Sequence, residues 1–443
     1  MTTVEILSGD VADQTPAVDD EERAVDVLGI GFGPANLSLA IAIEERNAVL
    51  APDRRTTACF VESKDGFGWH DGMLLPGSTM QISFLKDLVS QRSPTSTYSF
   101  LNYLHQRHRL TDFINLKTFF PTRREFHDYL SWAAERVSAP VRYGTTAARI
   151  EWSGSVFEVD VATAGGARET IRARDIVVGT GIRPVLPTGI APGPRVFHNH
   201  RLLERLSGLR VRRRARFVVV GAGQSAAEVA AYLHDRYPEA EVHASLRKFG
   251  YMPADDTPYA NRIFDPESVD EFFTAPAHLR RVLLDHHRLT NYGAVDAELI
   301  EDLYRREYRE RTEGTRRLFI HRVTEVSSIE EGEHGAVVAL RDIGGRGETL
   351  VDADAVVFAT GFRPWSVREL LGTSIPADEA YDTAEPIVSR DYRLKLDGIP
   401  GRIFLNGGVE HSHGLTSSLL SNLAPRATEI LRAVLEGDRV PVR

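Results

Sequence analysis

Two stretches of the chain share one pattern: a short apolar run, a glycine-rich turn, and then apolar positions at helical spacing. In the first stretch, residues 25–28 precede the turn Gly29–Asn36 and a helix-like segment that ends near Ala51. In the second, the run Phe217–Val220 precedes the turn Gly221–Glu228. Continuous apolar runs of this length are typical of buried parallel strands. The pattern therefore predicts two strand–turn–helix units, one near the start and one near the middle of the chain.

Further apolar runs predict strands at residues 57–61, 241–246, 175–181 and 354–362. The last two resemble each other, because each ends in Thr-Gly and is followed by Arg-Pro after one residue. Since this pair brackets the second glycine-rich turn, the sequence predicts one domain inserted into another. We expect an α/β fold with two Rossmann-like dinucleotide-binding domains and a small substrate-binding region. The expected boundaries are a disordered N-terminal tail at 1–22, a first domain at 23–205 and 345–443, and an inserted domain at 206–344.

Helical patterns also appear at residues 96–106 and 122–137. Between the first unit and these helices lies the segment 66–87, which is too rich in glycine and too irregular to predict as a helix or strand. It carries Trp, His, Gln and Lys close together. Because loops held by a rigid scaffold often contain functional residues, we expect this segment to contribute to a site.

The two glycine-rich turns indicate nucleotide binding. A Gly-x-Gly turn lets the backbone approach a pyrophosphate, and the following helix offers free N–H groups and the positive end of its dipole. Glu62, at the end of the next strand, can accept hydrogen bonds from a ribose hydroxyl, although a surface glutamate would give the same pattern. Arg247 and Lys248 follow the corresponding strand of the second unit. They suit the 2′-phosphate of NADPH, and exposed loop charges are the alternative interpretation.

Composition narrows the class of protein. The chain has 443 residues, 42% hydrophobic and 26% charged, which is typical of a globular protein with two or three domains. A formal net charge of −9 argues against nucleic acid or an anionic membrane as a partner. No apolar stretch is long enough to span a bilayer, and no secretory signal is visible. We therefore expect a cytoplasmic protein.

Cys59 is the only cysteine in the chain. A single cysteine excludes an intrachain disulfide and fits a reducing compartment. It also excludes the cysteine pair that disulfide reductases use as the redox partner of a flavin. Electrons that reach a flavin here must leave by another route, and molecular oxygen is the expected acceptor.

Histidines occur two residues apart at His198 and His200 and again at His411 and His413. Neither pair has a cysteine or carboxylate cluster at ligand spacing, so we assign no metal site. We expect His70 and His413 to line a flavin pocket instead.

A specific resemblance extends from Val25 to the end of the chain. The motifs that carry it are Gly29–Asn36, Trp69–Met73, Met80–Leu88, Phe120–Arg123, Gly223–Glu228, Asn261–Phe264, Thr290–Tyr292 and His413–Leu415. With these motifs the chain resembles the microbial flavin-dependent N-hydroxylating monooxygenases, and within them the L-ornithine N5-monooxygenases. The sequence departs from the expected pattern in three places: Pro34 replaces a third glycine, Thr79 stands where a lysine is common, and residues 416–418 read Thr-Ser-Ser.

The resemblance implies a set of site residues. The expected FAD contacts are Gly29, Gly31, Gly33, Pro34, Glu62, Ser63, Lys64, Trp69, His70, Gln81, Ala147, Leu415, Thr416 and Ser417. The expected NADPH contacts are Gly221, Ala222, Gly223, Gln224, Ser225 and Arg247. The expected substrate contacts are Lys86, which would pair with the α-carboxylate, together with Asn261, Arg262, Ile263, Phe264, Asn291 and Ser418. Asn291 would touch both NADP and the substrate, and is the expected catalytic residue.

The implied reaction has two halves. NADPH reduces FAD, and the reduced flavin traps O₂ as a C4a-hydroperoxide that transfers oxygen to the side-chain amine of L-ornithine. The product would be N5-hydroxy-L-ornithine, used for siderophores or other hydroxamate natural products. The family also implies a homo-oligomer, a tetramer or a dimer.

Alternatives stay open at this point. L-lysine differs from ornithine by one methylene, which is worth only about 0.8 kcal/mol of burial. A diamine substrate would lack the carboxylate that Lys86 is expected to bind. An uncoupled NADPH oxidase would share both glycine-rich turns but would not need Lys86, Asn261 or Asn291. A non-catalytic nucleotide sensor is the remaining alternative.

Overall fold

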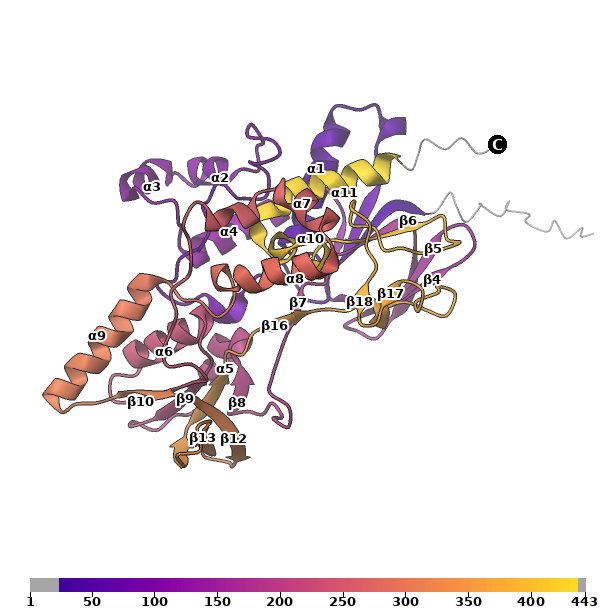
Figure 1. The fold of residues 1–443 in the computed structure, drawn as a ribbon. Helices are drawn as coiled ribbons and strands as arrows, with labels where there is room; N and C mark the ends of the chain where they lie inside the picture. The colour runs from indigo at the N-terminus through magenta and orange to yellow at the C-terminus, as the bar shows by residue number, and fades with distance from the viewer. Residues whose placement is uncertain (1–23, 437–443) are drawn as a thin grey trace, which may run out of the picture.

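The protein has two lobes, one built around a mixed sheet and the other around a parallel sheet (Figure 1). The computed structural model describes residues 24–436, so the tail predicted at residues 1–22 lies outside the described residues. Two short antiparallel strands join the lobes, β7 (Ile182–Pro184) and β16 (Phe362–Pro364). The α/β class and the two Rossmann-like sheets are thus confirmed.

The first lobe contains a seven-stranded sheet in the order β3-β2-β1-β6-β5-β4, with β19 paired to β6. The strands are β1 (Val25–Ile30), β2 (Ala58–Val61), β3 (Val141–Arg142), β4 (Thr145–Trp152), β5 (Phe157–Thr163), β6 (Arg168–Val178) and β19 (Arg402–Leu405). The first half of β6 pairs with β5 in antiparallel fashion, and its second half lies parallel to β1 and β19. The predicted strands at 25–28 and 57–61 are confirmed as β1 and β2, and β1 continues two residues further than predicted, to Ile30.

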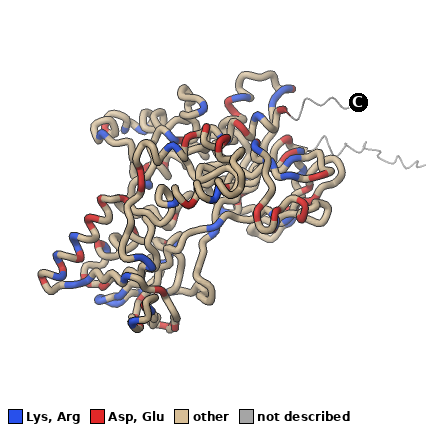
Figure 2. The backbone as a smooth tube through the Cα atoms, in the orientation of Figure 1, with Lys and Arg blue, Asp and Glu red and all other residues tan. Residues whose placement is uncertain are grey.

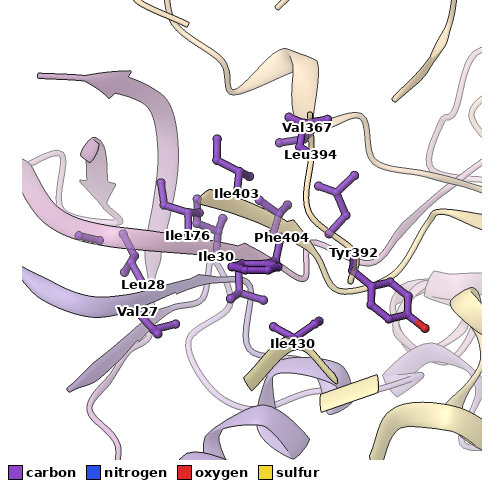
Figure 3. Packing of buried hydrophobic residues seen from close by; sticks show 14 of the residues in the cluster. Val27, Leu28, Ile30, Ile176, Val367, Tyr392, Leu394, Ile403, Phe404 and Ile430 are labelled. Atoms are coloured by element: carbon purple, nitrogen blue, oxygen red, sulfur yellow. The ribbon is translucent and has the colours of Figure 1, made fainter. Parts of the chain in front are cut away.

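Helices α1 (Pro34–Ala48) and α11 (Leu423–Glu436) pack against each other and on this sheet (Figure 1). Their apolar side chains join a core made by β1, β6 and β19, which Figure 3 shows from close by. Leu28, Ile176 and Phe404 are fully buried there, and Ile430 of α11 packs onto them. This core explains why the apolar runs read as continuous rather than alternating, because the strands are covered on both faces.

Three helices follow the irregular segment 66–87: α2 (Phe100–Gln106), α3 (Leu110–Leu116) and α4 (Arg123–Arg136). The hydroxyl of Ser99 caps α2 by accepting the Asn102 N–H, and Thr122 caps α4 by accepting the Glu125 N–H. The predicted helices at 96–106 and 122–137 are confirmed, with the first beginning at Phe100 after its cap.

The second lobe contains a five-stranded, fully parallel sheet in the order β11-β10-β9-β15-β8. Its strands are β8 (Val196–His198), β9 (Arg216–Val220), β10 (Glu241–Leu246), β11 (Leu318–Arg322) and β15 (Ala355–Phe358). Helices α5 (Leu202–Gly208), α6 (Gln224–Arg236) and α9 (Ala297–Glu313) belong to this lobe. An antiparallel sheet of β12 (Thr324–Glu331), β13 (Ala336–Asp342) and β14 (Glu348–Ala353) completes it.

The predicted limits of the inserted domain, 206 and 344, need correction. β8 and β15 lie outside those limits, yet both pair within the second sheet. The two similar apolar runs at 175–181 and 354–362 therefore belong to different sheets: β6 lies beside β1, and β15 lies beside β9. Their similarity arises because each occupies the same place in its own Rossmann-like sheet. The insertion itself is present, since the chain returns to the first sheet at β19.

The remaining short elements are α7 (Ser268–Thr274), α8 (Ala277–His286), α10 (Glu410–His413) and the hairpin of β17 (Tyr381–Asp382) and β18 (Glu385–Pro386). The hairpin belongs to the first lobe, because Tyr381 is buried in its core and the hairpin lies beside β4 and β5 (Figure 1). Figure 2 shows basic and acidic residues mixed along α9 and over both lobes. Across residues 24–436, none of the helices combines the length and apolar character that crossing a bilayer would need.

Candidate active site

A cavity of about 3320 Å³ lies where the two lobes meet. Residues of both glycine-rich turns, of the irregular segment 66–87, and of the segments around Asn261, Asn291 and Ser418 line it. A pocket for one small molecule typically measures about 300–1,000 Å³. This cavity therefore has room for two dinucleotides and a small substrate.

The first glycine-rich turn meets the cavity at the start of α1. Gly31 has a φ of +84°, and a Cβ there would lie 2.5 Å from the Gly179 carbonyl oxygen. A Cβ at Gly33, by contrast, would have no other atom within 4 Å. α1 begins at Pro34 without a side-chain cap, so its first N–H groups are available to an anion. The turn thus has the geometry of a phosphate cradle.

Glu62 is fixed next to this turn. Its carboxylate accepts hydrogen bonds from the backbone N–H of Phe32 at 2.8 Å and of Lys64 at 3.0 Å. Glu62 lines the cavity at the end of β2. This is the arrangement that a ribose hydroxyl requires of a carboxylate in a Rossmann-like domain.

A buried amide pair, which the sequence pattern did not predict, holds the turn in place. The Asn36 side-chain amide donates to the Gly31 carbonyl at 2.7 Å, and the Asn406 amide donates to Asn36 Oδ1 at 3.0 Å. Both asparagines are buried. They tie the first turn to the loop that follows β19.

Arg426 of α11 extends this network toward the C-terminal segment. Its guanidinium donates to Asn406 Oδ1 at 2.9 Å and to the Ser417 carbonyl at 2.6 Å. Arg426 is 3% exposed, and the visible signal in the sequence is a charge on the otherwise apolar face of α11. The adjacent Ser417 Oγ is buried in the cavity wall without a hydrogen-bond partner. Such an orphaned hydroxyl fits a bound ligand, so this wall suits a cofactor.

The second glycine-rich turn lies on the other side of the cavity. A Cβ at Gly221 would lie 2.4 Å from the Ala359 carbonyl oxygen, so this position also requires glycine. α6 begins at Gln224 after Gly223, again without a side-chain cap. The expected NADPH contacts that line the cavity are Gly221, Ala222, Gly223, Gln224, Ser225 and Arg247.

Polar side chains join the lobes beside this second turn. Arg123 of α4 and Glu228 of α6 form a buried, two-pronged ion pair with N···O distances of 2.9 and 2.8 Å. The Asp296 carboxylate accepts hydrogen bonds from the side-chain amides of Gln81 at 3.1 Å and of Gln224 at 2.7 Å. These contacts fix the position of the second lobe relative to the loop that carries Gln81.

The expected substrate residues that line the cavity are Lys86, Asn261, Phe264, Asn291 and Ser418. Lys86 is half-buried, and it forms no ion pair with any of residues 24–436. The Asn261 amide donates to the Asp256 carbonyl at 2.8 Å, which leaves its side-chain oxygen available. The wall therefore combines an unpaired ammonium group with neutral amides.

Five of the expected contact residues lie outside the cavity wall: Gly29, Arg262, Ile263, Leu415 and Thr416. A Cβ at Gly29 would lie 2.1 Å from Phe60, so this glycine serves packing between strands. Leu415 and Thr416 are buried beneath the wall. The guanidinium of Arg262 instead lies over the ring of Tyr259, 5.4 Å from its centre.

The two histidines expected near the flavin are placed differently. His70 lines the cavity, and desolvation by the surrounding protein together with the charge of Arg123 lowers its pKa to about 4. The expectation for His413 is wrong, since it is buried away from the cavity, stacked on Tyr392 with ring centres 4.2 Å apart. It packs there because its Nε2 reaches the Arg390 carbonyl at 3.2 Å.

His413 gives the fold a predictable pH dependence. Burial lowers its pKa to about 3, whereas an unfolded histidine titrates near 6.5. Only the unfolded chain then binds this proton, so the free energy of unfolding should fall as pH decreases from about 6.5 toward 3. His413→Gln should reduce the slope by up to about 1.4 kcal/mol per pH unit in urea titrations at several pH values. His105→Gln, on the exposed face of α2, is the control, and equal slopes in His413→Gln and wild type would contradict the assignment.

Comparison with known proteins agrees with this geometry. The sequence model of the L-lysine 6-monooxygenase/L-ornithine 5-monooxygenase family matches residues 23–364. The L-ornithine N(5)-monooxygenase of Burkholderia cepacia is 40% identical over 94% of this chain and 96% of its own length.

Two solved structures extend the comparison. The Kutzneria sp. 744 ornithine N-hydroxylase, whose structure is described with reduced FAD, NADP⁺ and L-ornithine, aligns with a TM-score of 0.87 and 40% identity over 94% of this chain and all of that one. The L-lysine 6-monooxygenase of Pseudomonas syringae aligns with a TM-score of 0.78 and 31% identity over 93% of this chain and 99% of that one. This chain therefore belongs to the L-lysine 6-monooxygenase/L-ornithine 5-monooxygenase family, the flavin-dependent N-hydroxylating monooxygenases.

Proposed function

We propose that this protein is an L-ornithine N5-monooxygenase that uses FAD, NADPH and O₂. The observation that carries the proposal is that both glycine-rich turns line one cavity together with Lys86, whose ammonium forms no ion pair with residues 24–436. Ornithine is favoured over lysine because the ornithine hydroxylase is the more similar of the two solved relatives in both sequence and structure.

The first lobe suits FAD. The turn at Gly31 and Gly33 would bind the phosphates of FAD. The carboxylate of Glu62 would bind its ribose, and the Ser417 hydroxyl, which has no partner in the described residues, would bind near its flavin ring. The second lobe, around Gly221 and Arg247, would bind NADPH. When bound, FAD would supply the redox chemistry, accepting a hydride from NADPH and transferring one oxygen atom of O₂ to the amine.

The protein's own groups would bind and orient the substrate. Lys86 would hold the α-carboxylate, and Asn261 and Asn291 would present neutral amides toward the rest of the molecule. An alkylammonium has a pKa of about 10.4, so presenting the reactive amine uncharged near neutral pH costs roughly 3–5 kcal/mol. A carboxylate against that amine would raise this cost, whereas amides do not.

Gly31→Ala should lower the FAD content of the purified protein at least about tenfold, because the new Cβ would displace the Gly179 carbonyl and distort the cradle. Gly166→Ala is a matched control, since Gly166 has the same φ of +84° but open space around it. The ratio of flavin absorbance to protein absorbance measures the FAD content of both variants. Full flavin content in Gly31→Ala would contradict the role of this turn.

The function itself is tested by comparing hydroxylamine formed with NADPH consumed. The proposal predicts a ratio close to one when L-ornithine is present. NADPH consumption without hydroxylamine would identify an oxidase, and no consumption at all would identify a nucleotide sensor.

Two further expectations belong with this proposal. We infer a homo-oligomer, either a dimer or a tetramer, which light scattering on the purified protein would measure. We also infer a cytoplasmic enzyme, because one lone cysteine and a need for NADPH both suit a reducing compartment.

A further inference from the structure

Two arginines from distant parts of the second lobe share one carboxylate. Arg247 follows β10, and its guanidinium lies 3.0 Å from Glu325 Oε2. Arg341 is on β13, and its guanidinium lies 2.5 Å from the other oxygen, Glu325 Oε1. The three side chains form a triad that we name the arginine clamp.

The arginine clamp lies in the wall of the cavity, at the end of β10. Thr324 and Ser327 line the cavity on either side of Glu325. The Ser245 and Thr324 hydroxyls are hydrogen-bonded at 3.0 Å, which fastens the end of β10 to the start of β12. In a Rossmann-like domain this strand end is where the adenosine ribose of a dinucleotide lies.

Stability does not account for the arginine clamp. The side chains of Arg247 and Arg341 are 71% and 59% exposed, and exposed ion pairs contribute little to folding. The triad carries a net charge of +1, and each guanidinium uses one terminal nitrogen on Glu325, so other N–H groups are free to donate. Paired guanidiniums are the preferred protein ligands for a phosphate dianion. The neighbouring Lys248 is already engaged, because its ammonium donates to the Gly293 carbonyl at 3.0 Å.

We propose that Arg341, together with Arg247, binds the 2′-phosphate of NADPH, and that the Glu325 carboxylate occupies the phosphate position in the free enzyme. Arg341 comes from the antiparallel sheet, outside the strand–turn–helix unit. It therefore has no counterpart in the sequence pattern that indicated Arg247. The inference rests on the proposed use of NADPH.

The test uses two nucleotides that differ by the phosphate in question: adenosine 2′,5′-bisphosphate and adenosine 5′-monophosphate, titrated into the holoenzyme by calorimetry. Arg341→Ala should weaken bisphosphate binding about tenfold or more and leave monophosphate binding unchanged. Arg346→Ala is the matched control. Arg346 is an exposed arginine next to the same strand, paired with Asp342 and absent from the cavity wall. It should bind both nucleotides like wild type.

Glu325→Gln distinguishes two roles of the Glu325 carboxylate. It could occupy the phosphate position in the free enzyme, or it could hold the two arginines in place for the phosphate. If the carboxylate occupies the phosphate position, its removal should tighten bisphosphate binding about threefold, because an anion no longer competes. Weaker bisphosphate binding in Glu325→Gln would overturn this part of the proposal. Unchanged bisphosphate binding in Arg341→Ala, or equal loss for both nucleotides, would overturn the role of Arg341.

Failure of this inference is distinguishable from failure of the proposed function. If wild type prefers the bisphosphate but Arg341→Ala keeps that preference, only Arg341 is wrongly assigned and NADPH use stands. If wild type binds both nucleotides equally and NADH reduces the flavin as fast as NADPH does, the coenzyme assignment and the inference both fall. Neither result would affect hydroxylation of ornithine.

Discussion

Replacing Lys86 by alanine should raise KM for L-ornithine about 30- to 150-fold while flavin reduction by NADPH stays within about twofold of wild type. Lys86 is a half-buried cation without an ion-pair partner among residues 24–436, and it faces the cavity. Truncating one member of a partly desolvated charge pair costs about 2–3 kcal/mol, which corresponds to that range of affinity. Steady-state kinetics measure KM, and anaerobic stopped-flow measures the reduction rate.

Putrescine makes this prediction specific, because it is ornithine without the carboxylate. If Lys86 binds the carboxylate, wild type and Lys86→Ala should have the same KM for putrescine. Lys395→Ala serves as the control, since that lysine is exposed and outside the cavity wall. An unchanged KM for ornithine, or an equal loss for both substrates, would contradict the carboxylate assignment.

Replacing Arg123 by alanine should lower the free energy of unfolding by about 3–5 kcal/mol, because it leaves Glu228 as an unpaired buried charge. The two side chains are only 11% and 8% exposed, so water cannot compensate. The same change should slow flavin reduction, since this pair joins the helix after the second glycine-rich turn to the first lobe. Urea unfolding and stopped-flow reduction measure the two effects.

The double variant Arg123→Met/Glu228→Met should recover most of the lost stability, because no buried charge is left. It should not recover the reduction rate if the ion pair orients the lobes. Arg142→Ala is the control, since the Arg142–Glu169 pair is more exposed and its loss should cost less than about 1 kcal/mol. A loss below about 1 kcal/mol in Arg123→Ala would contradict the buried character of the interlobe pair.

Local features of this fold could be predicted from the sequence because their signals lie close together. The run at 241–246 is β10 with those bounds, and Thr122 marks the start of α4 because a threonine three residues before a glutamate caps a helix. Likewise Glu62 follows its strand directly, so its place beside the first turn follows from the Rossmann-like pattern.

Other features could not be predicted because distant residues make them. Asn36 and Asn406 are 370 positions apart, and the sequence contains nothing that pairs them. The domain limits were wrong for a related reason: β6 and β15 carry the same apolar run and the same Thr-Gly ending, although they join different sheets. Gly29 was expected to contact the cofactor, but it packs against Phe60 instead. The sequence could not distinguish these roles, because either close packing or an approaching phosphate can require a glycine.

The central claim is that this cavity hydroxylates the side-chain amine of ornithine with an oxygen atom from O₂. The most direct measurement is mass spectrometry of the products formed from equal amounts of L-ornithine and L-lysine with NADPH and ¹⁸O₂. The account predicts N5-hydroxy-L-ornithine carrying one ¹⁸O, in about tenfold or greater excess over hydroxylysine, because pockets discriminate one methylene by about 1–3 kcal/mol. A predominance of hydroxylysine, or NADPH oxidation without any labelled amino acid, would contradict it.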